Sequence, residues 1–183
     1  MTSHPDQSPT LNRIIVVGTT GSGKTTMAGR LAQKLNLPHT ELDALNWGPD
    51  WTMLPNEKFR ALVDQASSKN RWVIDGNYSR SRDITWPRAD TIVWLDYSLP
   101  RILWRLWRRT LRRTLTKEEL WAGNQERLWT HLFTRDSLFL WALQTYKRRR
   151  REYPELLSRP ENSHLTLFRF HTPSQADTWL ASL

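Results

Sequence analysis

The chain has 183 residues, of which 38% are hydrophobic and 25% are charged, and its formal net charge is +9. These proportions suit one globular domain with a real core, and most of the eleven tryptophans are expected to lie in that core. The lack of cysteine excludes disulfides and thiolate metal sites, and the lack of a long apolar run excludes a transmembrane helix. We expect a disordered lead-in over residues 1–12, without a signal-peptide pattern, and a single cytoplasmic domain over 13–183.

The predicted elements alternate between strands and helices. In chain order we expect a strand at 13–17, helix at 25–36, weaker strand at 39–43, helix at 57–68, strands at 71–76 and 91–96, helix through 101–114, helix at 136–157, strand at 164–170 and helix at 174–183. Thr116 and Glu119 form the capping-box pattern of a further short helix, and Pro154 is expected to end or kink the long helix. The alternation predicts an α/β fold with three layers and a doubly wound, five-stranded parallel sheet.

A phosphate-binding motif follows the first predicted strand. Residues 18–25, GTTGSGKT, fit the pattern G-x-x-x-x-G-K-[ST] at every fixed position. Its glycines let backbone N–H groups point at phosphate oxygens, Lys24 places a charge on the β- and γ-phosphates, and the Thr25 hydroxyl can bind Mg²⁺. The motif predicts ATP and Mg²⁺ as cofactors. The residues expected to bind ATP here are Gly18, Thr19, Thr20, Gly21, Ser22, Gly23, Lys24, Thr25 and Thr26.

Acidic residues close three of the predicted strands. Asp75 closes the third strand, where a carboxylate can hold the metal directly or through water, or can cap the following turn. Asp43 closes the second strand and could position or deprotonate an acceptor group, or serve as a cap or ion-pair partner. Arg80 and Arg82 lie in the basic loop after Asp75 and could bind an anionic acceptor, or be solvated. Asp96 is expected to be structural.

The positive charge is concentrated in two clusters. Six arginines lie within residues 101–113 and five basic side chains within 147–151, which leaves the remainder slightly acidic. On a helical wheel the six arginines occupy one side. The opposite side is expected to pack in the core and carries Leu103, Trp104, Leu106, Trp107 and Leu111. A nucleic-acid or membrane surface would show the same pattern, but a helix that follows a strand has a sheet to pack on.

Four segments together resemble the P-loop small-molecule kinases of the adenylate kinase type: GTTGSGKTT, LDALNWGPDW, WVIDGNYSR and ADTIVWLDYSLPRILWRLWRR. Within that group, residues 13–113 most resemble the bacterial DNA topology modulation (FlaR-type) and adenylate-kinase-related proteins. The resemblance implies ATP with Mg²⁺ as the donor and a mobile helical lid at about 112–147. It also implies an adenine contact by the loop after the last strand, namely Phe170, His171, Thr172 and Pro173.

The chain also departs from adenylate kinases. Asp75 and Arg80 match the Asp and Arg of their D-G-x-P-R motif, with one extra residue between them. The T-G-[DE]-x-x-R segment, whose Arg grips the AMP phosphate, is replaced by ELDALNW, which keeps Asp43 but lacks the Arg, and the G-R-R lid motif is missing. The resemblance therefore leaves the acceptor open.

These observations favour a phosphotransferase that moves the γ-phosphate of ATP to a small acceptor, either a nucleotide or another anionic metabolite. We expect Lys24, Asp43, Asp75, Arg105 and Arg108 to be catalytic, and expect Arg109 to bind ATP. One alternative is a P-loop ATPase that binds DNA or RNA through its arginine-rich helices. Another is a peripheral membrane or structural binder. Steep salt dependence of binding to arbitrary DNA would favour the first alternative, and acceptor-stimulated ADP release would favour the kinase.

Overall fold

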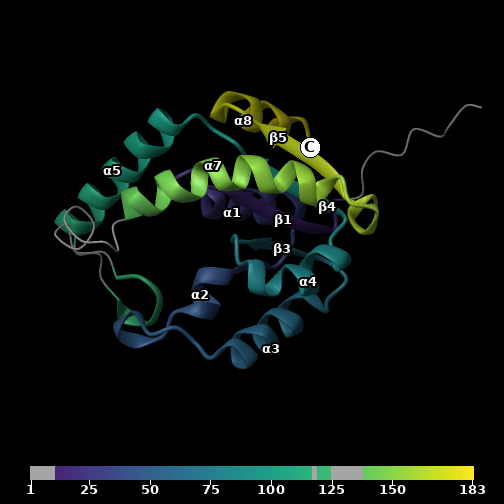
Figure 1. Ribbon diagram of the computed structural model, residues 1–183, viewed down its shortest axis with the longest axis horizontal. Helices are drawn as coiled ribbons and strands as arrows, with labels where there is room; N and C mark the ends of the chain where they lie inside the picture. Colours follow the sequence, from purple (N-terminus) through teal and green to yellow (C-terminus); the bar gives the residue numbers. More distant parts are fainter. Residues whose placement is uncertain (1–10, 117–118, 125–137) are drawn as a thin grey trace, which may run out of the picture.

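The computed structural model describes residues 11–116, 119–124 and 138–183 (Figure 1). Its five strands form one parallel sheet in the order β2-β3-β1-β4-β5, which confirms the predicted α/β architecture. The strands are β1 (Arg13–Gly18), β2 (His39–Glu41), β3 (Trp72–Asp75), β4 (Thr91–Leu95) and β5 (Thr166–Phe170). The chain winds outward from β1 in both directions, so a crevice opens beside the carboxyl end of β1, where ligands bind in sheets of this type.

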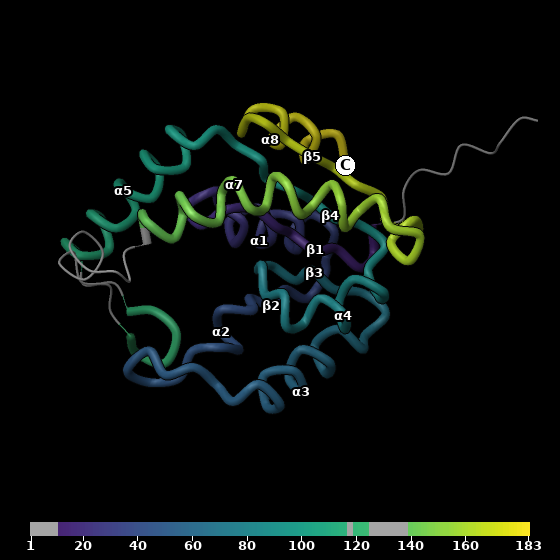
Figure 2. Tube along the Cα trace, viewed as in Figure 1, coloured from purple at the N-terminus to yellow at the C-terminus, as the bar shows by residue number. Residues whose placement is uncertain are grey.

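Helices cover both faces of the sheet (Figure 1). The helices are α1 (Lys24–Leu35), α2 (Leu42–Asn46), α3 (Asn56–Ser67), α4 (Arg82–Thr85), α5 (Leu99–Thr116), α7 (Leu138–Leu157) and α8 (Pro173–Ser182). Short 3₁₀ turns join them: η1 (Pro49–Trp51), η2 (Ser79–Ser81), η3 (Trp86–Arg88), η4 (Trp121–Gly123) and η5 (Pro160–Asn162). The backbone trace shows α5 and α7 extending beyond the sheet on the side of the crevice (Figure 2).

The core lies in two layers because successive residues of a strand point to opposite faces. Ile14 and Val16 of β1 belong to the cluster under α1 and α8. Ile15 and Val17 belong to the cluster under α3, α4 and the end of α7. All four side chains are at most 3% exposed, which explains why this strand is an unbroken apolar run.

Two regions differ from the sequence prediction near the crevice. The second strand ends at Glu41, so Asp43 lies in the first turn of α2 and not at a strand end. The segment 77–90, expected to be a loop, contains η2, α4 and η3. In both regions the side chains lie on short helical turns. Such turns could not be predicted, because they have too few residues to show a helical pattern of apolar positions.

The predicted helix boundaries also need correction. Thr116 is the last residue of α5, and its hydroxyl donates to the carbonyl of Arg112, so it ends a helix; the short helix expected after it begins outside the described residues. Pro154 lies inside α7, which continues to Leu157. Residues 1–10 of the expected lead-in, and residues 117–118 and 125–137 of the expected lid, lie outside the described residues. Leu11 packs against the core.

The packing face of α5 is not the one that the sequence predicted. Its buried residues are Ile102, Leu106 and Thr110, whereas Trp104 and Trp107 are 57% and 42% exposed and stack on each other with ring centroids 5.3 Å apart. The expectation that the Trp/Leu side forms the core was therefore wrong for Trp104 and Trp107 and right for Leu106. The buried face of the helix lies against the phosphate-binding loop, where Ile102 and Leu106 stand beside Gly21.

Among the described residues, no helix is both long enough and apolar enough to cross a membrane.

Candidate functional site

The phosphate-binding loop joins β1 to α1 and is shaped by close contact with α5. Gly21 and Gly23 have φ values of 81° and 94°, in the left-handed region that favours glycine. A Cβ atom on Gly21 would lie 3.0 Å from the carbonyl oxygen of Ile102, and one on Gly23 would lie 2.7 Å from Nη2 of Arg105. Glycine is therefore favoured at both positions by backbone conformation, and at Gly21 also by the close approach of the α5 backbone. The second contact places the Arg105 guanidinium directly against the loop.

Asn77 fixes the start of this loop. Its side-chain amide donates to the carbonyl of Gly18 at 2.7 Å, and its Oδ1 accepts from the Gly18 N–H at 3.1 Å. The Tyr153 hydroxyl of α7 donates to the same Oδ1 at 3.1 Å. Asn77 thus ties the loop to α7. The sequence reasoning missed it, and its position two residues after Asp75 was the only available signal.

Lys24 is partly buried and surrounded by charged groups of both signs. Desolvation lowers the pKa of Lys24; Asp43 and Asp75 oppose that shift, and Arg149 and Arg109 add to it. An anion bound in the loop would compensate the positive charges that crowd this lysine. The site therefore has the electrostatics of a phosphate receptor.

Asp75 and Thr25 are in contact and fit a magnesium ion by their chemistry. The Thr25 hydroxyl donates to Oδ1 of Asp75 at 3.1 Å, and Oδ2 of Asp75 lies 2.8 Å from Nε2 of His39. Asp75 is only 3% exposed. A hydroxyl and a carboxylate suit Mg²⁺, which takes few protein ligands and completes its shell with phosphate and water. No group of three or more His, Asp or Glu side chains that could hold a metal occurs in the described part of the chain.

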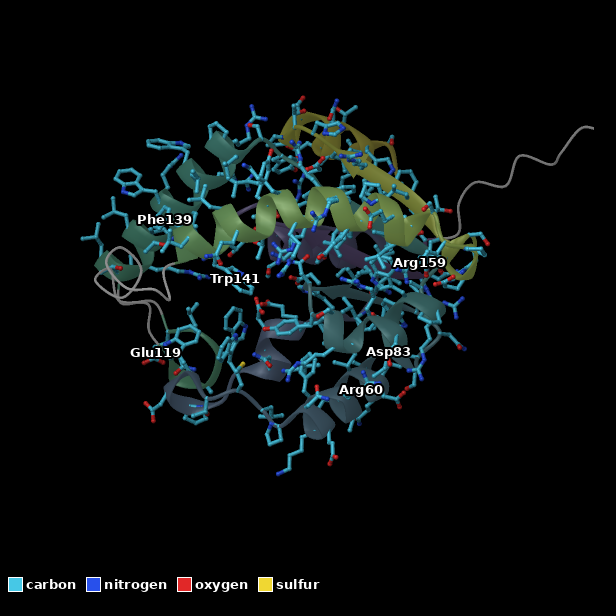
Figure 3. All side chains as sticks on the ribbon, in the orientation of Figure 1. Arg60, Asp83, Glu119, Phe139, Trp141 and Arg159 are labelled. Atoms are coloured by element: carbon cyan, nitrogen blue, oxygen red, sulfur yellow. The ribbon has the colours of Figure 1, made fainter. Side chains whose placement is uncertain are left out.

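A cleft of about 2490 Å³ opens in front of the loop, and its two sides differ in charge. One side, here called the basic wall, belongs to α5 and α7, which pack together. Its cationic members are Arg105, Arg108, Arg109, Arg112, Arg113, Arg148 and Arg149. Figure 3 shows Trp141 of α7 on this side and Glu119 on the opposite side.

Arg149 is the most buried member of the basic wall, at 7% exposed. Its Nη1 donates to the Thr145 hydroxyl at 3.1 Å, and burial lowers the pKa of its guanidinium. Within the described ranges, no carboxylate pairs with it. A buried arginine without an acidic partner is costly unless a ligand supplies the anion. The sequence did not single out this residue, because it is one of five consecutive basic side chains at 147–151.

The other side of the cleft, here called the acidic wall, belongs to β2, α2, η1, η2, η4 and residues next to these elements. Its polar and aromatic members are Glu41, Asp43, Asn46, Trp47, Asp50, Trp51, Tyr78, Arg80, Glu119, Trp121 and Asn124. The Tyr78 hydroxyl donates to Oδ1 of Asp43 at 2.6 Å, and burial together with Asp43 raises the pKa of Tyr78. This hydrogen bond uses one carboxylate oxygen of Asp43, a residue that lines the cleft.

Residues of the predicted lid complete the acidic wall. The Asn124 amide donates to the carbonyls of Gly48 and Trp121, both at 2.8 Å, and its Oδ1 accepts from the Trp51 N–H at 2.9 Å. The Trp121 indole donates to Oε2 of Glu41 at 3.2 Å. In Figure 1, η4 accordingly lies beside the segment after α2. No sequence pattern had connected positions 121–124 with 41–51.

The remaining predicted site residues lie elsewhere. The Arg82 guanidinium stands over the rings of Trp86 and Tyr153, at 5.1 and 5.8 Å from their centroids. His171, Thr172 and Pro173 lead into α8, where Thr172 forms a capping box with Gln175. None of these residues is among those that line the cleft. They stay predictions as ligand contacts.

Asp96 is structural, as the sequence suggested. It is 4% exposed and accepts hydrogen bonds from Arg150 of α7 at 2.6 Å and from Arg169 of β5 at 2.6 Å. One carboxylate thus ties α7 to the carboxyl ends of β4 and β5. This ion pair takes Arg150 out of the cationic cluster at 147–151.

Known proteins resemble the chain in fold and, more distantly, in sequence. Residues 14–96 match the ATPase family associated with various cellular activities (AAA). The shikimate kinase from Acinetobacter baumannii in complex with shikimate is 16% identical, with a TM-score of 0.61, and the match covers 95% of this chain and 93% of that one. The fold is that of the P-loop kinases. A gluconokinase from Sinorhizobium meliloti 1021 gives 18% identity and a TM-score of 0.52, with 94% and 93% covered.

A curated relative agrees with this fold. An adenylate kinase from Mycobacterium sp. (strain MCS) is 31% identical over 111 residues, which cover 50% of this chain and 61% of that protein. The chain thus spans less than two thirds of this relative's length. This distant similarity to an adenylate kinase agrees with the resemblance seen in the four sequence segments.

Proposed function

We propose that the protein is an ATP- and Mg²⁺-dependent phosphotransferase that moves the γ-phosphate of ATP to a hydroxyl group of a small-molecule acceptor. One observation carries the proposal: Lys24 lies in the glycine loop between the arginines of the basic wall and Asp43 of the acidic wall. A phosphoryl donor and an acceptor can therefore meet at Lys24. The P-loop kinase fold supports the same reaction class.

The donor phosphates would lie in the glycine loop at the start of α1, where backbone N–H groups and the helix dipole favour anions. Lys24 and Arg105, which lies against Gly23, would neutralise the phosphate charge. Arg149 and Arg109 act on Lys24 electrostatically from the same side, so they would stabilise the charge of the phosphoryl group in transfer. Thr25 and Asp75 would hold Mg²⁺, which supplies charge neutralisation when bound.

Asp43 is suited to receive the proton of the acceptor. The acceptor oxygen forms the new O–P bond, the bond from the γ-phosphorus to the β,γ-bridging oxygen breaks, and ADP leaves with the electron pair. The hydroxyl proton passes to the free carboxylate oxygen of Asp43, while Tyr78 holds the other oxygen in place. In this scheme the acceptor hydroxyl gives its proton to Asp43 directly, without another protein group between them.

Arg80 supports an anionic acceptor less strongly than its sequence position suggested. It lines the cleft, but its guanidinium donates to Oδ1 of Asn46 and stacks 4.1 Å from the ring centroid of Phe59. A nucleotide or another anionic metabolite would have to displace the Asn46 contact. The alternative of DNA or RNA binding rested on the arginines of the two basic clusters. Most of these arginines line the cleft, where they are suited to a small anion.

A coupled ADP-release assay tests the proposal directly. Nucleoside monophosphates, nucleosides, sugars, amino alcohols and small acids should be screened for stimulation of ADP release with Mg²⁺ and ATP. Lys24→Ala should reduce the stimulated rate at least about 100-fold while circular dichroism remains native, because the β- and γ-phosphates lose their point charge. Lys69→Ala, on an exposed loop, is the matched control and should leave the rate unchanged. A folded Lys24→Ala variant with full turnover contradicts the proposal.

A further inference from the structure

The acidic wall has the chemistry of a receptor for a positively charged group, and this inference rests on the proposed function. Among the residues that the structure describes, four carboxylates line it, those of Glu41, Asp43, Asp50 and Glu119, against the one cation Arg80. The seven arginines of the cleft's other side all belong to α5 and α7. ATP would occupy that basic side, so the acceptor would meet mainly carboxylates, aromatic rings and one amide.

Glu41 is the carboxylate best placed to meet an acceptor. It lies at the end of β2, lines the cleft and accepts from the Trp121 indole at 3.2 Å through Oε2. No basic side chain in the described ranges pairs with it. A bound cation would relieve the electrostatic cost of this carboxylate.

A second and independent feature of the wall also points to a ligand. Asn46 is fully buried and lines the cleft, and its Nδ2 donor has no hydrogen-bond partner, while its Oδ1 accepts from Arg80. Leaving a buried donor unsatisfied is unfavourable, because the group has lost its hydrogen bonds to water and gained none in return. An oxygen atom of an acceptor would satisfy this amide. The wall thus offers carboxylates for donors of the ligand and an amide N–H for one of its oxygens.

Aromatic rings enclose the same space. Trp47 and Trp51 meet edge to face with centroids 5.7 Å apart, and both line the cleft together with Trp121. Indole faces attract ammonium groups and pack against C–H surfaces. The one arginine on this side, Arg80, is already engaged by Asn46 and Phe59 and is poorly available to an anion.

We propose that the acceptor is an amino alcohol, whose hydroxyl group meets Asp43 and whose protonated amine lies between Glu41 and the indole rings of Trp47 and Trp121. The transfer step is the one given above: the hydroxyl oxygen forms the new O–P bond, ADP leaves, and the proton passes to Asp43. The amine stays protonated and takes no part in bond making. Glu41 selects the acceptor and does not act on the reacting atoms.

Binding of matched acceptors that differ in charge tests this proposal. The first set is ethanolamine, ethylene glycol and glycolate, and the second is glucosamine, glucose and gluconate. Affinities should be measured at pH 7 from tryptophan fluorescence, with Mg²⁺ and a non-hydrolysable ATP analogue present. In at least one set the amine is expected to bind about tenfold more tightly than its neutral and anionic counterparts, since a charged hydrogen bond is gained.

Variants at Glu41 assign the preference to this residue. Glu41→Gln keeps the shape and an acceptor for Trp121 but removes the charge, so it should abolish the preference for the amine and leave the affinity for the neutral compound within about twofold. Glu41→Asp keeps the charge and should retain part of the preference. Glu57→Gln, an exposed residue of α3, is the control and should change nothing.

The outcomes separate this inference from the proposed function. Tighter binding of the anion or of the neutral compound in both sets, or an undiminished amine preference in Glu41→Gln, overturns the inference even if that compound stimulates ADP release. Amine-selective binding that depends on Glu41 supports it. If no acceptor in the wider screen stimulates ADP release, the proposed function fails, while the binding result still decides the chemistry of the wall.

Discussion

The two walls of the cleft are built in different ways, although both face the same phosphate-binding loop. The basic wall consists of two long helices, α5 and α7, which present arginines at helical spacing. The acidic wall comes from three distant parts of the chain: the side chain of Asn124 joins two of them, and the hydrogen bond from Tyr78 to Asp43 joins the third. The first wall is a regular surface whose charge can be tuned by single substitutions. The second depends on each of its contacts for its shape.

This difference separates the binding of the donor from the binding of the acceptor. The basic wall should govern the charge on the phosphates and hence turnover, because arginines aimed at transferred phosphate act mainly in the transition state. The acidic wall should govern which acceptor binds. Substitutions on the two walls are therefore expected to change different kinetic constants, and that separation can be measured.

The largest effect is expected at the basic wall from Arg149→Met. Removing the buried guanidinium should lower kcat about 100-fold and leave the Kd of the acceptor unchanged. Stability should stay equal or increase, because a buried cation without a carboxylate partner is replaced by an apolar side chain of similar length. Steady-state kinetics and urea unfolding measure the two quantities. Arg151→Met, exposed on the same helix, is the control.

Loss of stability in Arg149→Met without loss of turnover would reverse this assignment, since the arginine would then serve only to hold α7 in place. Arg150, the next residue, shows what such a structural arginine looks like: it is paired with Asp96, a carboxylate that is 3% exposed at its side chain. Arg150 and Arg149 can therefore be compared directly: the first is paired with a carboxylate of the protein, and the second has no carboxylate partner in the described ranges.

The sequence predicted the basic half of this site better than the acidic half. The phosphate-binding motif, Asp75 and the arginines of α5 were found because each lies on a long element or in a motif of fixed spacing. The sheet itself followed from the alternation of apolar runs with helical periodicity, and its five strands are all parallel, as predicted.

Of the acidic half, the sequence reasoning had named Asp43 and Arg80, but the rest of this wall could not be predicted in the same way. Trp121 meets Glu41 across 80 residues of sequence, and Asn124 meets Trp51 across 73. Contacts between residues so far apart produce no periodic pattern in the sequence. A single sequence also contains no information on which distant residues will meet. Asn77 was missed for a related reason: its role depends on the peptide of Gly18, 59 residues away, and not on its neighbours.

A smaller effect is expected at the acidic wall from Asn124→Ala. The substitution leaves the Trp51 N–H and the Gly48 carbonyl without their partner, so η4 should detach from the segment after α2. Acceptor affinity should fall about tenfold and the free energy of unfolding by about 1–3 kcal/mol, whereas the affinity for ATP should not change. Isothermal titration with ATP, and fluorescence titration with the acceptor, give the two affinities. Equal losses in both would mean that the walls are not independent.

The smallest effect concerns α5, where the packing face differs from the predicted one. Trp104→Ala removes a whole indole, yet the ring is 57% exposed, so the free energy of unfolding should change by less than about 0.5 kcal/mol. Ile102→Val removes one methylene from a side chain that is 1% exposed and should cost about 0.5–1.5 kcal/mol. Urea unfolding of the two variants measures both values. If Trp104→Ala lowered the free energy of unfolding more than Ile102→Val, the face of α5 that carries Trp104 and Trp107 would be packed in solution. The basic wall would then extend onto the surface that these two indoles cover.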